Sequence, residues 1–138
     1  MDKIRKAGRT TKAVYLGLDV HERTYSVSVF FEGEELMNNT YPSDVRHLKK
    51  LLSRYEKFPV HAVYEAGPFG YTLFDWLKSQ GVRVIVTPPS KMPVASGDFV
   101  KTDKRDARKL AHLLSCGLLK SVPVPDRVKR EDRDLLRT

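Results

Sequence analysis

Short apolar runs alternate along the chain with segments of helical periodicity, and the first part of the chain contains only the short runs. Residues 13–19 form an apolar run that ends abruptly at a charge, as expected of a central strand. Residues 24–31 alternate polar with apolar side chains, and the Glu-Gly-Glu sequence at 32–34 predicts a turn into a strand over residues 35–41. These three segments predict an antiparallel meander.

In the rest of the chain, helical patterns alternate with two further apolar strands. The first helix is predicted to begin at Ser43, its expected N-cap. Strands are predicted over residues 60–65 and 82–86, and helices over residues 69–80 and from about 102 to 115. The order βββαβαβα is that of a ribonuclease H-like (RuvC-like) α/β fold, a mixed five-stranded sheet with flanking helices.

The length of 138 residues accommodates one domain with a single core. We expect a basic flexible arm over residues 1–12, the folded domain over residues 13–120, and a charged tail over residues 121–138 that begins a helical connector. Cys116 is the only cysteine, which excludes an intrachain disulfide and favours a reducing cytoplasm.

The net charge of +8 favours a polyanionic partner, with DNA first, because contacts to phosphates release condensed counterions. An anionic membrane surface is the alternative polyanion, but no stretch approaches the ~20 apolar residues that a spanning helix requires, and no membrane partner is expected.

Four acidic residues stand at positions where the predicted fold gathers them. Asp19 and Glu65 each end an apolar strand, and the handedness of crossover connections places these strands side by side and parallel. Asp103 and Asp106 are three residues apart and share one face of the last helix. Magnesium prefers hard oxygen ligands, and two ions about 3.5 to 4 Å apart stabilise an in-line displacement at phosphorus. The pattern predicts a Mg²⁺ or Mn²⁺ site that works on phosphodiesters.

Three of the four acids also have a simpler interpretation. Asp19 is compatible with closing a strand by accepting hydrogen bonds from backbone amides, Asp103 suits the first turn of a helix because of the helix dipole, and Glu65 is compatible with a buried salt bridge. The four acids together, in this order and on this topology, favour the metal site.

Basic residues surround the acid pair of the last helix and are predicted to contact phosphates, which position a duplex without reading its sequence. These candidates for nucleic-acid binding are Lys101, Lys104, Arg105, Arg108 and Lys109. The alternative is a solvated helix face with pairs of opposite charge four residues apart. His21 is interpreted as a turn residue, with contact to a leaving group or phosphate as the alternative.

Three blocks together resemble the amino-terminal domain of the IS110/IS1111 family of insertion-sequence transposases. They are Gly-Leu-Asp-Val at 17–20, Tyr-Glu-Ala-Gly-Pro at 64–68 and Lys-Thr-Asp-Lys-Arg-Asp-Ala-Arg at 101–108. The resemblance implies a RuvC-like domain whose Asp, Glu, Asp, Asp (DEDD) tetrad binds magnesium and takes part in DNA strand cleavage and exchange. The tetrad maps onto Asp19, Glu65, Asp103 and Asp106.

The resemblance also implies features of a longer protein: a separate domain with a nucleophilic serine, a homo-oligomer, a nucleoid-associated location in a prokaryotic cytoplasm and, in the IS110 group, a structured guide RNA. The family's chains continue beyond the point where this sequence stops, so we expect the chain to supply part of an active site.

Three other functions are compatible with parts of the pattern. A stand-alone nuclease of the Holliday-junction type would share the fold and the metal chemistry. An ATPase lobe of the actin or sugar-kinase type is disfavoured, because residues 20–23 bring bulk and charge where such lobes cradle phosphate with small residues. A non-catalytic nucleic-acid-binding or dimerisation module, in which the acids are structural, is the third.

Overall fold

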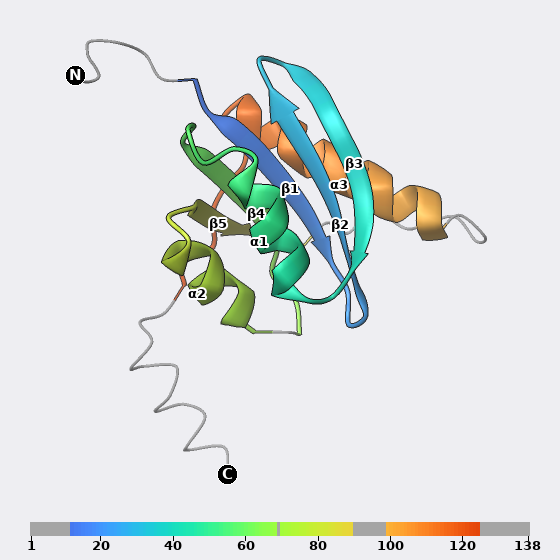
Figure 1. The fold of residues 1–138 in the computed structure, drawn as a ribbon. Helices are drawn as coiled ribbons and strands as arrows, with labels where there is room; N and C mark the ends of the chain where they lie inside the picture. The colour runs from blue at the N-terminus through green and yellow to red at the C-terminus, as the bar shows by residue number, and fades with distance from the viewer. Residues whose placement is uncertain (1–11, 69, 90–98, 125–138) are drawn as a thin grey trace.

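A computed structural model describes residues 12–68, 70–89 and 99–124, and for residues 99–103 it describes the backbone only. Residues 1–11 of the predicted basic arm and residues 125–138 of the charged tail lie outside these ranges, so the division into arm, domain and tail stays a prediction. The elements in chain order are β1 (Val14–Val20), β2 (Thr24–Phe31), β3 (Glu34–Pro42), α1 (Val45–Ser53), β4 (Val60–Glu65), α2 (Thr72–Ser79), β5 (Arg83–Thr87) and α3 (Phe99–Ser115) (Figure 1).

The five strands form one mixed sheet in the order β3-β2-β1-β4-β5. β1 and β2, and β2 and β3, pair antiparallel, whereas β4 pairs in parallel with both β1 and β5. Helices α1 and α2 cover one face of the sheet and α3 covers the other (Figure 1). This topology is the ribonuclease H-like fold that the order of the elements predicts. Within the described ranges, no helix is long and apolar enough to cross a membrane.

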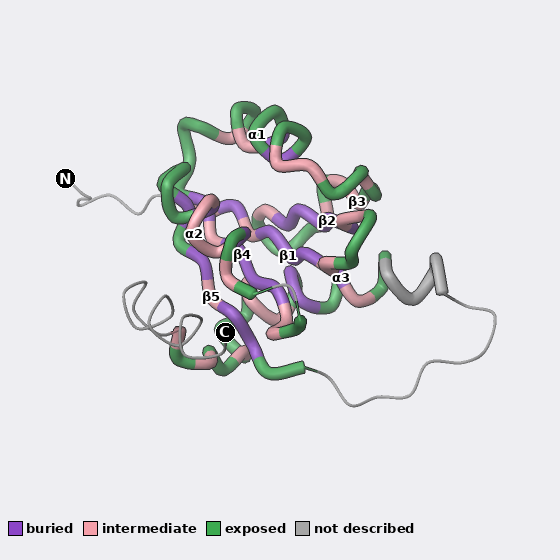
Figure 2. Tube along the Cα trace, turned by 90° about the horizontal axis from the view of Figure 1, so that it is seen from below, coloured by how far each residue is buried: buried purple, intermediate pink, exposed green. Residues whose placement is uncertain are grey.

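The main apolar core lies between the sheet and the helices α1 and α2. Leu16 and Leu18 of β1 are at most 1% exposed, because alternate strand residues point to the same face of the sheet. Leu48 of α1 and Leu77 of α2 pack into the same cluster. Figure 2 shows the buried segments running along β1, β2, β4 and β5 between the helices.

The predicted N-cap of the first helix was wrong by one residue. Asp44 is the N-cap, and its Oδ1 accepts a hydrogen bond from the backbone N–H of Arg46 at 2.9 Å. The hydroxyl of Ser43 instead donates to the carbonyl oxygen of Glu22 at 2.8 Å, in the segment that joins β1 to β2. Ser43 therefore anchors the chain to the turn, and Asp44 starts the helix.

Candidate metal centre

Asp19 and Glu65 lie at the carboxyl ends of two neighbouring parallel strands. The register of β1 and β4 pairs Leu18 with Tyr64, so the two acids are the next residues along each strand. Both acids line a cavity of about 280 Å³, together with residues of the loop after β4. The strand pairing that the crossover rule predicts is therefore present, and it brings the first two acids together.

Asp106 reaches the same region from α3. It lines a second cavity, of about 170 Å³, with Glu65 and with Thr87 at the end of β5. Glu65 thus lines both cavities, one with Asp19 and the other with Asp106. Magnesium usually keeps several waters and needs only one or two carboxylates from the protein. The carboxylates that line these cavities are the type of ligand that such an ion takes.

Asp103 lies on α3 three residues before Asp106, and its side chain is outside the described part of the structure. Among the side chains that are described, His, Cys, Asp and Glu form no group of three or more that could hold a metal ion. Asp19, Glu65 and Asp106 are among these side chains, so the structure brings them to one edge of the sheet without forming a closed metal site, and the tetrad as a metal site stays a prediction.

Gly17 explains why α3 lies so close to the strand that carries Asp19. A Cβ atom at Gly17 would overlap the carbonyl oxygen of Ala107 and the backbone nitrogen of Ala111, and it would lie 3.1 Å from the Cα of Ala111. Both alanines are fully buried. Because strand side chains alternate, Gly17 and Asp19 share the face of the sheet that α3 covers. The helix that carries Asp106 is thus in backbone contact with β1 two residues before Asp19.

His21 lies in the turn between β1 and β2, as interpreted, and its side chain also contacts Asp19. Its backbone N–H donates to the carbonyl oxygen of Thr24 in the turn between β1 and β2. Its Nε2 also lies 3.1 Å from Oδ2 of Asp19, and the side chains of His21 and Asp19 are 45% and 14% exposed. The imidazole therefore holds one oxygen of a carboxylate at the rim of the first cavity.

The basic residues predicted to bind nucleic acid lie on α3 in different surroundings. Lys104, Arg105 and Lys109 are exposed. Arg108 is also half exposed, but its Nε lies 3.1 Å from Oε1 of Glu35, with which it forms an ion pair. The side chain of Lys101 lies outside the described part of the structure. The predicted phosphate contact of Arg108 would compete with this ion pair.

Three residues near the acids were not recognised as functional candidates from the sequence. Gly17 carried a readable signal, because an isolated glycine inside an apolar strand marks a close backbone approach. Thr87, only 5% exposed, pairs in register with Glu65 and lines the second cavity. Glu35 begins the predicted third strand and contacts Arg108 of α3, and no local pattern in the sequence indicates that contact.

Comparison with known proteins agrees with the resemblance in the three sequence blocks. The chain is 37% identical over 109 residues to the transposase for insertion sequence element IS1533 of Leptospira borgpetersenii, a match that covers 75% of this chain and 31% of that protein. It is 36% identical over 133 residues to protein y4qE of Sinorhizobium fredii, covering 91% and 34%. The chain spans about a third of the length of these relatives.

Among solved structures, the chain is similar to RuvC of Thermus thermophilus in complex with a Holliday junction substrate. The sequence identity is 12%, the match covers 80% of this chain and 99% of that chain, and the TM-score is 0.48. The model of the IS110-type DEDD family, described as "Transposase", matches residues 16–138. This chain belongs to the IS110 family of DEDD transposases.

Proposed function

We propose that this chain is the metal-binding RuvC-like domain of an insertion-sequence transposase, acting in DNA strand cleavage and exchange. The observation that carries the proposal is the position of Glu65, which lines one cavity with Asp19 and the other with Asp106. With Asp103, these acids would hold Mg²⁺ or Mn²⁺. When bound, divalent ions stabilise the attacking and leaving oxygens of a displacement at phosphorus.

The protein's own residues would bind and orient the DNA around that centre. Exposed Lys104 and Arg105 lie between the two acids of α3, and exposed Lys109 follows them; these residues would supply positive charge for phosphates flanking the scissile bond. His21 keeps the carboxylate of Asp19 in one orientation through the contact of 3.1 Å. The β1–α3 contact at Gly17 keeps the two sources of carboxylates together.

Strand exchange itself is proposed for the longer protein, because this chain spans about a third of its relatives. That protein would join this domain to a serine-bearing domain, assemble as a homo-oligomer, and act on DNA in the prokaryotic cytoplasm. A structured guide RNA as a second partner belongs to the same proposal.

Thermal unfolding in the presence of Mn²⁺ tests the metal centre. An ion that binds only the native state at 100 times its dissociation constant stabilises the protein by about 2.7 kcal/mol. We expect the wild type to show a higher Tm in Mn²⁺ and Asp19→Asn to lose that increase. Without metal, Asp19→Asn should be at least as stable as the wild type, since clustered carboxylates repel one another.

The control is Glu56→Gln, which removes an exposed acid that lies after α1 and outside both cavities. It should keep the full response to Mn²⁺. A wild-type Tm that does not change in millimolar Mn²⁺ would contradict the proposal, and so would an equal increase in Asp19→Asn.

A further inference from the structure

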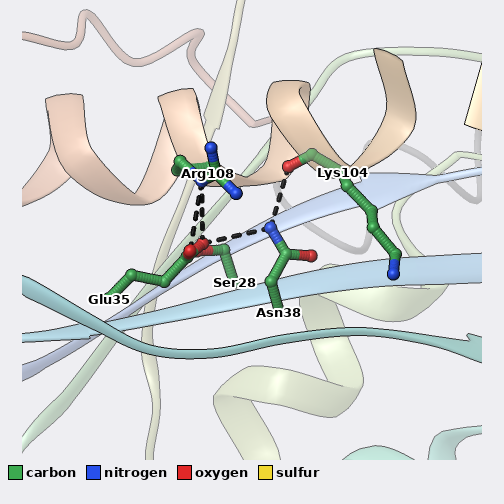
Figure 3. Close-up of polar contacts among 5 residues, drawn as sticks. All are labelled: Ser28, Glu35, Asn38, Lys104 and Arg108. Atoms are coloured by element: carbon green, nitrogen blue, oxygen red, sulfur yellow. Dashed lines mark hydrogen bonds and ion pairs between the residues drawn. The ribbon is translucent and has the colours of Figure 1, made fainter. Parts of the chain in front are cut away.

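Two strands and α3 are joined by one polar network on the α3 face of the sheet (Figure 3). Glu35 Oε2 accepts hydrogen bonds from Ser28 Oγ at 2.6 Å and from Asn38 Nδ2 at 3.0 Å. Arg108 Nε donates to both oxygens of Glu35, at 3.1 and 3.2 Å. Asn38 Nδ2 also donates to the backbone carbonyl of Lys104 at 2.9 Å. The strand β3 is thus tied to α3 at two points one helical turn apart.

A β-bulge in β3 makes this network possible. The pairing of β2 with β3 shifts by one residue, which leaves Leu36 as an extra, half-exposed residue in β3. Side chains three residues apart on a regular strand point to opposite faces, and one inserted residue reverses that alternation. The bulge therefore turns both Glu35 and Asn38 toward α3.

The network favours a charged Glu35. Burial raises the pKa of Glu35, but the hydrogen bonds from Ser28, Asn38 and Arg108 and the positive charge of Arg108 outweigh burial and hold the pKa below its ordinary value. Both amide hydrogens of Asn38 point to acceptors, which fixes the orientation of its side chain. Within the described part of the chain, its Oδ1 is buried without a hydrogen-bond partner.

Next to the network, the contact between α3 and β1 is made by small residues. Gly17 lies against the backbone of Ala107 and Ala111, and Ser28, which pairs with Gly17 in the sheet, is fully buried. Phe30 of β2 adds a larger contact, with its ring 5.6 Å from that of His112. Small side chains permit close contact but offer few ridges to stop a helix from sliding. A shift by one residue moves a helix by about 1.5 Å and turns its side chains by about 100°. Directional polar bonds such as those of Glu35 and Asn38 add contacts that define the position along the axis.

We infer that Glu35 and Asn38 are positioning residues for the metal centre, because they set the axial position of the helix that carries Asp103 and Asp106. The inference rests on the proposed function for its metal part only. Lys104 and Arg108, the two residues that they hold, lie on either side of Asp106 in the sequence of α3. Carboxylates that bind metal must be held within about 0.5 Å of the productive geometry. Loss of the two bonds is expected to disturb that geometry without unfolding the sheet.

The test compares Asn38→Ser with Asn39→Ser in this 138-residue chain. The two variants make the same chemical change at neighbouring positions, but Asn39 is exposed and its side-chain amide donates to Tyr41 Oη at 3.5 Å rather than to α3. The first measurement is amide hydrogen exchange without metal. Asn38→Ser should increase exchange in α3 and leave β4 protected, whereas Asn39→Ser should change neither.

The second measurement is the affinity for Mn²⁺ by calorimetry, at a temperature where all variants are folded. Loss of a partner behind the metal ligands typically weakens binding about 10- to 100-fold, and we expect this range for Asn38→Ser and for Glu35→Gln. A purely structural role would lower the Tm and leave the affinity of the folded protein unchanged.

Equal exchange in α3 for the two asparagine variants would overturn the inference, and so would faster exchange with unchanged Mn²⁺ affinity. A wild type that binds no Mn²⁺ would instead overturn the proposed function. The exchange comparison would then still decide whether Asn38 fixes α3.

Discussion

The two faces of the sheet bury different kinds of side chain. The face under α1 and α2 buries large aliphatic side chains, such as Leu16 and Leu77, in one continuous cluster. The face under α3 has a glycine, serines and alanines at the contact, with a charged and hydrogen-bonded network beside them. The acids of the candidate metal centre lie at the edge of this second face.

This difference separates what stabilises the fold from what shapes the site. Apolar burial contributes free energy roughly in proportion to the buried area, and this contribution is non-directional. Close backbone contact and directional hydrogen bonds contribute less but depend steeply on geometry. We therefore expect substitutions on the first face to change the free energy of unfolding, and substitutions on the second to change metal affinity as well.

The largest effect on stability is expected at the first face. Leu77 is fully buried, and Leu77→Ala should lower the free energy of unfolding by about 2 to 5 kcal/mol through lost burial and a cavity. Urea titration measures that loss. Calorimetry on the variant that remains folded should give the wild-type affinity for Mn²⁺, and a weakened affinity would break the separation between the faces.

Gly17→Ala tests the closest contact of the second face. The added methyl group must push α3 away from β1, and such overpacking costs about 1 to 3 kcal/mol. Here we expect both a lower free energy of unfolding in urea and weaker Mn²⁺ binding. An unchanged free energy of unfolding, or an unchanged affinity for Mn²⁺, would remove the special role of Gly17.

The pH dependence of stability tests the ion pair of Glu35 with Arg108. Because the folded-state pKa of Glu35 lies below its ordinary value of 4.5, its charged form stabilises the fold above that value. This contribution is lost as the pH falls through the folded-state pKa. The difference in unfolding free energy between the wild type and Glu35→Gln should therefore shrink below pH 4.5. A difference that grows on acidification would contradict the ion pair.

The smallest effect is expected on the outer side of α3. Lys104→Gln should weaken binding to duplex DNA at low salt and reduce the slope of log affinity against log salt by about 1, as loss of one phosphate contact does. Its Mn²⁺ affinity should stay unchanged, because the network uses only the backbone carbonyl of Lys104. Fluorescence anisotropy over a salt series measures the slope, and an unchanged slope would exclude this lysine from the DNA contact.

The strand order and the edge shared by Asp19 and Glu65 were predictable from the sequence, because apolar runs and the handedness of crossovers are strong local and topological signals. The cap at Asp44 was missed because Ser43 is an equally good capping residue one position earlier. The hydrogen-bond network of Glu35 could not be predicted from the sequence. It joins residues 73 positions apart and depends on a bulge at Leu36 that leaves no local mark in an otherwise alternating strand.

The most direct test of the account is a crystal of this chain soaked in Mn²⁺ and measured at the manganese absorption edge. The account predicts anomalous density at the carboxyl edge of β1 and β4, between Asp19, Glu65 and Asp106. It also predicts that the Asn38→Ser crystal, soaked in the same way, shows weaker density there. Anomalous density confined to other sites would contradict this metal centre. The absence of any anomalous density, in a crystal where the three carboxylates keep the positions described, would contradict it as well.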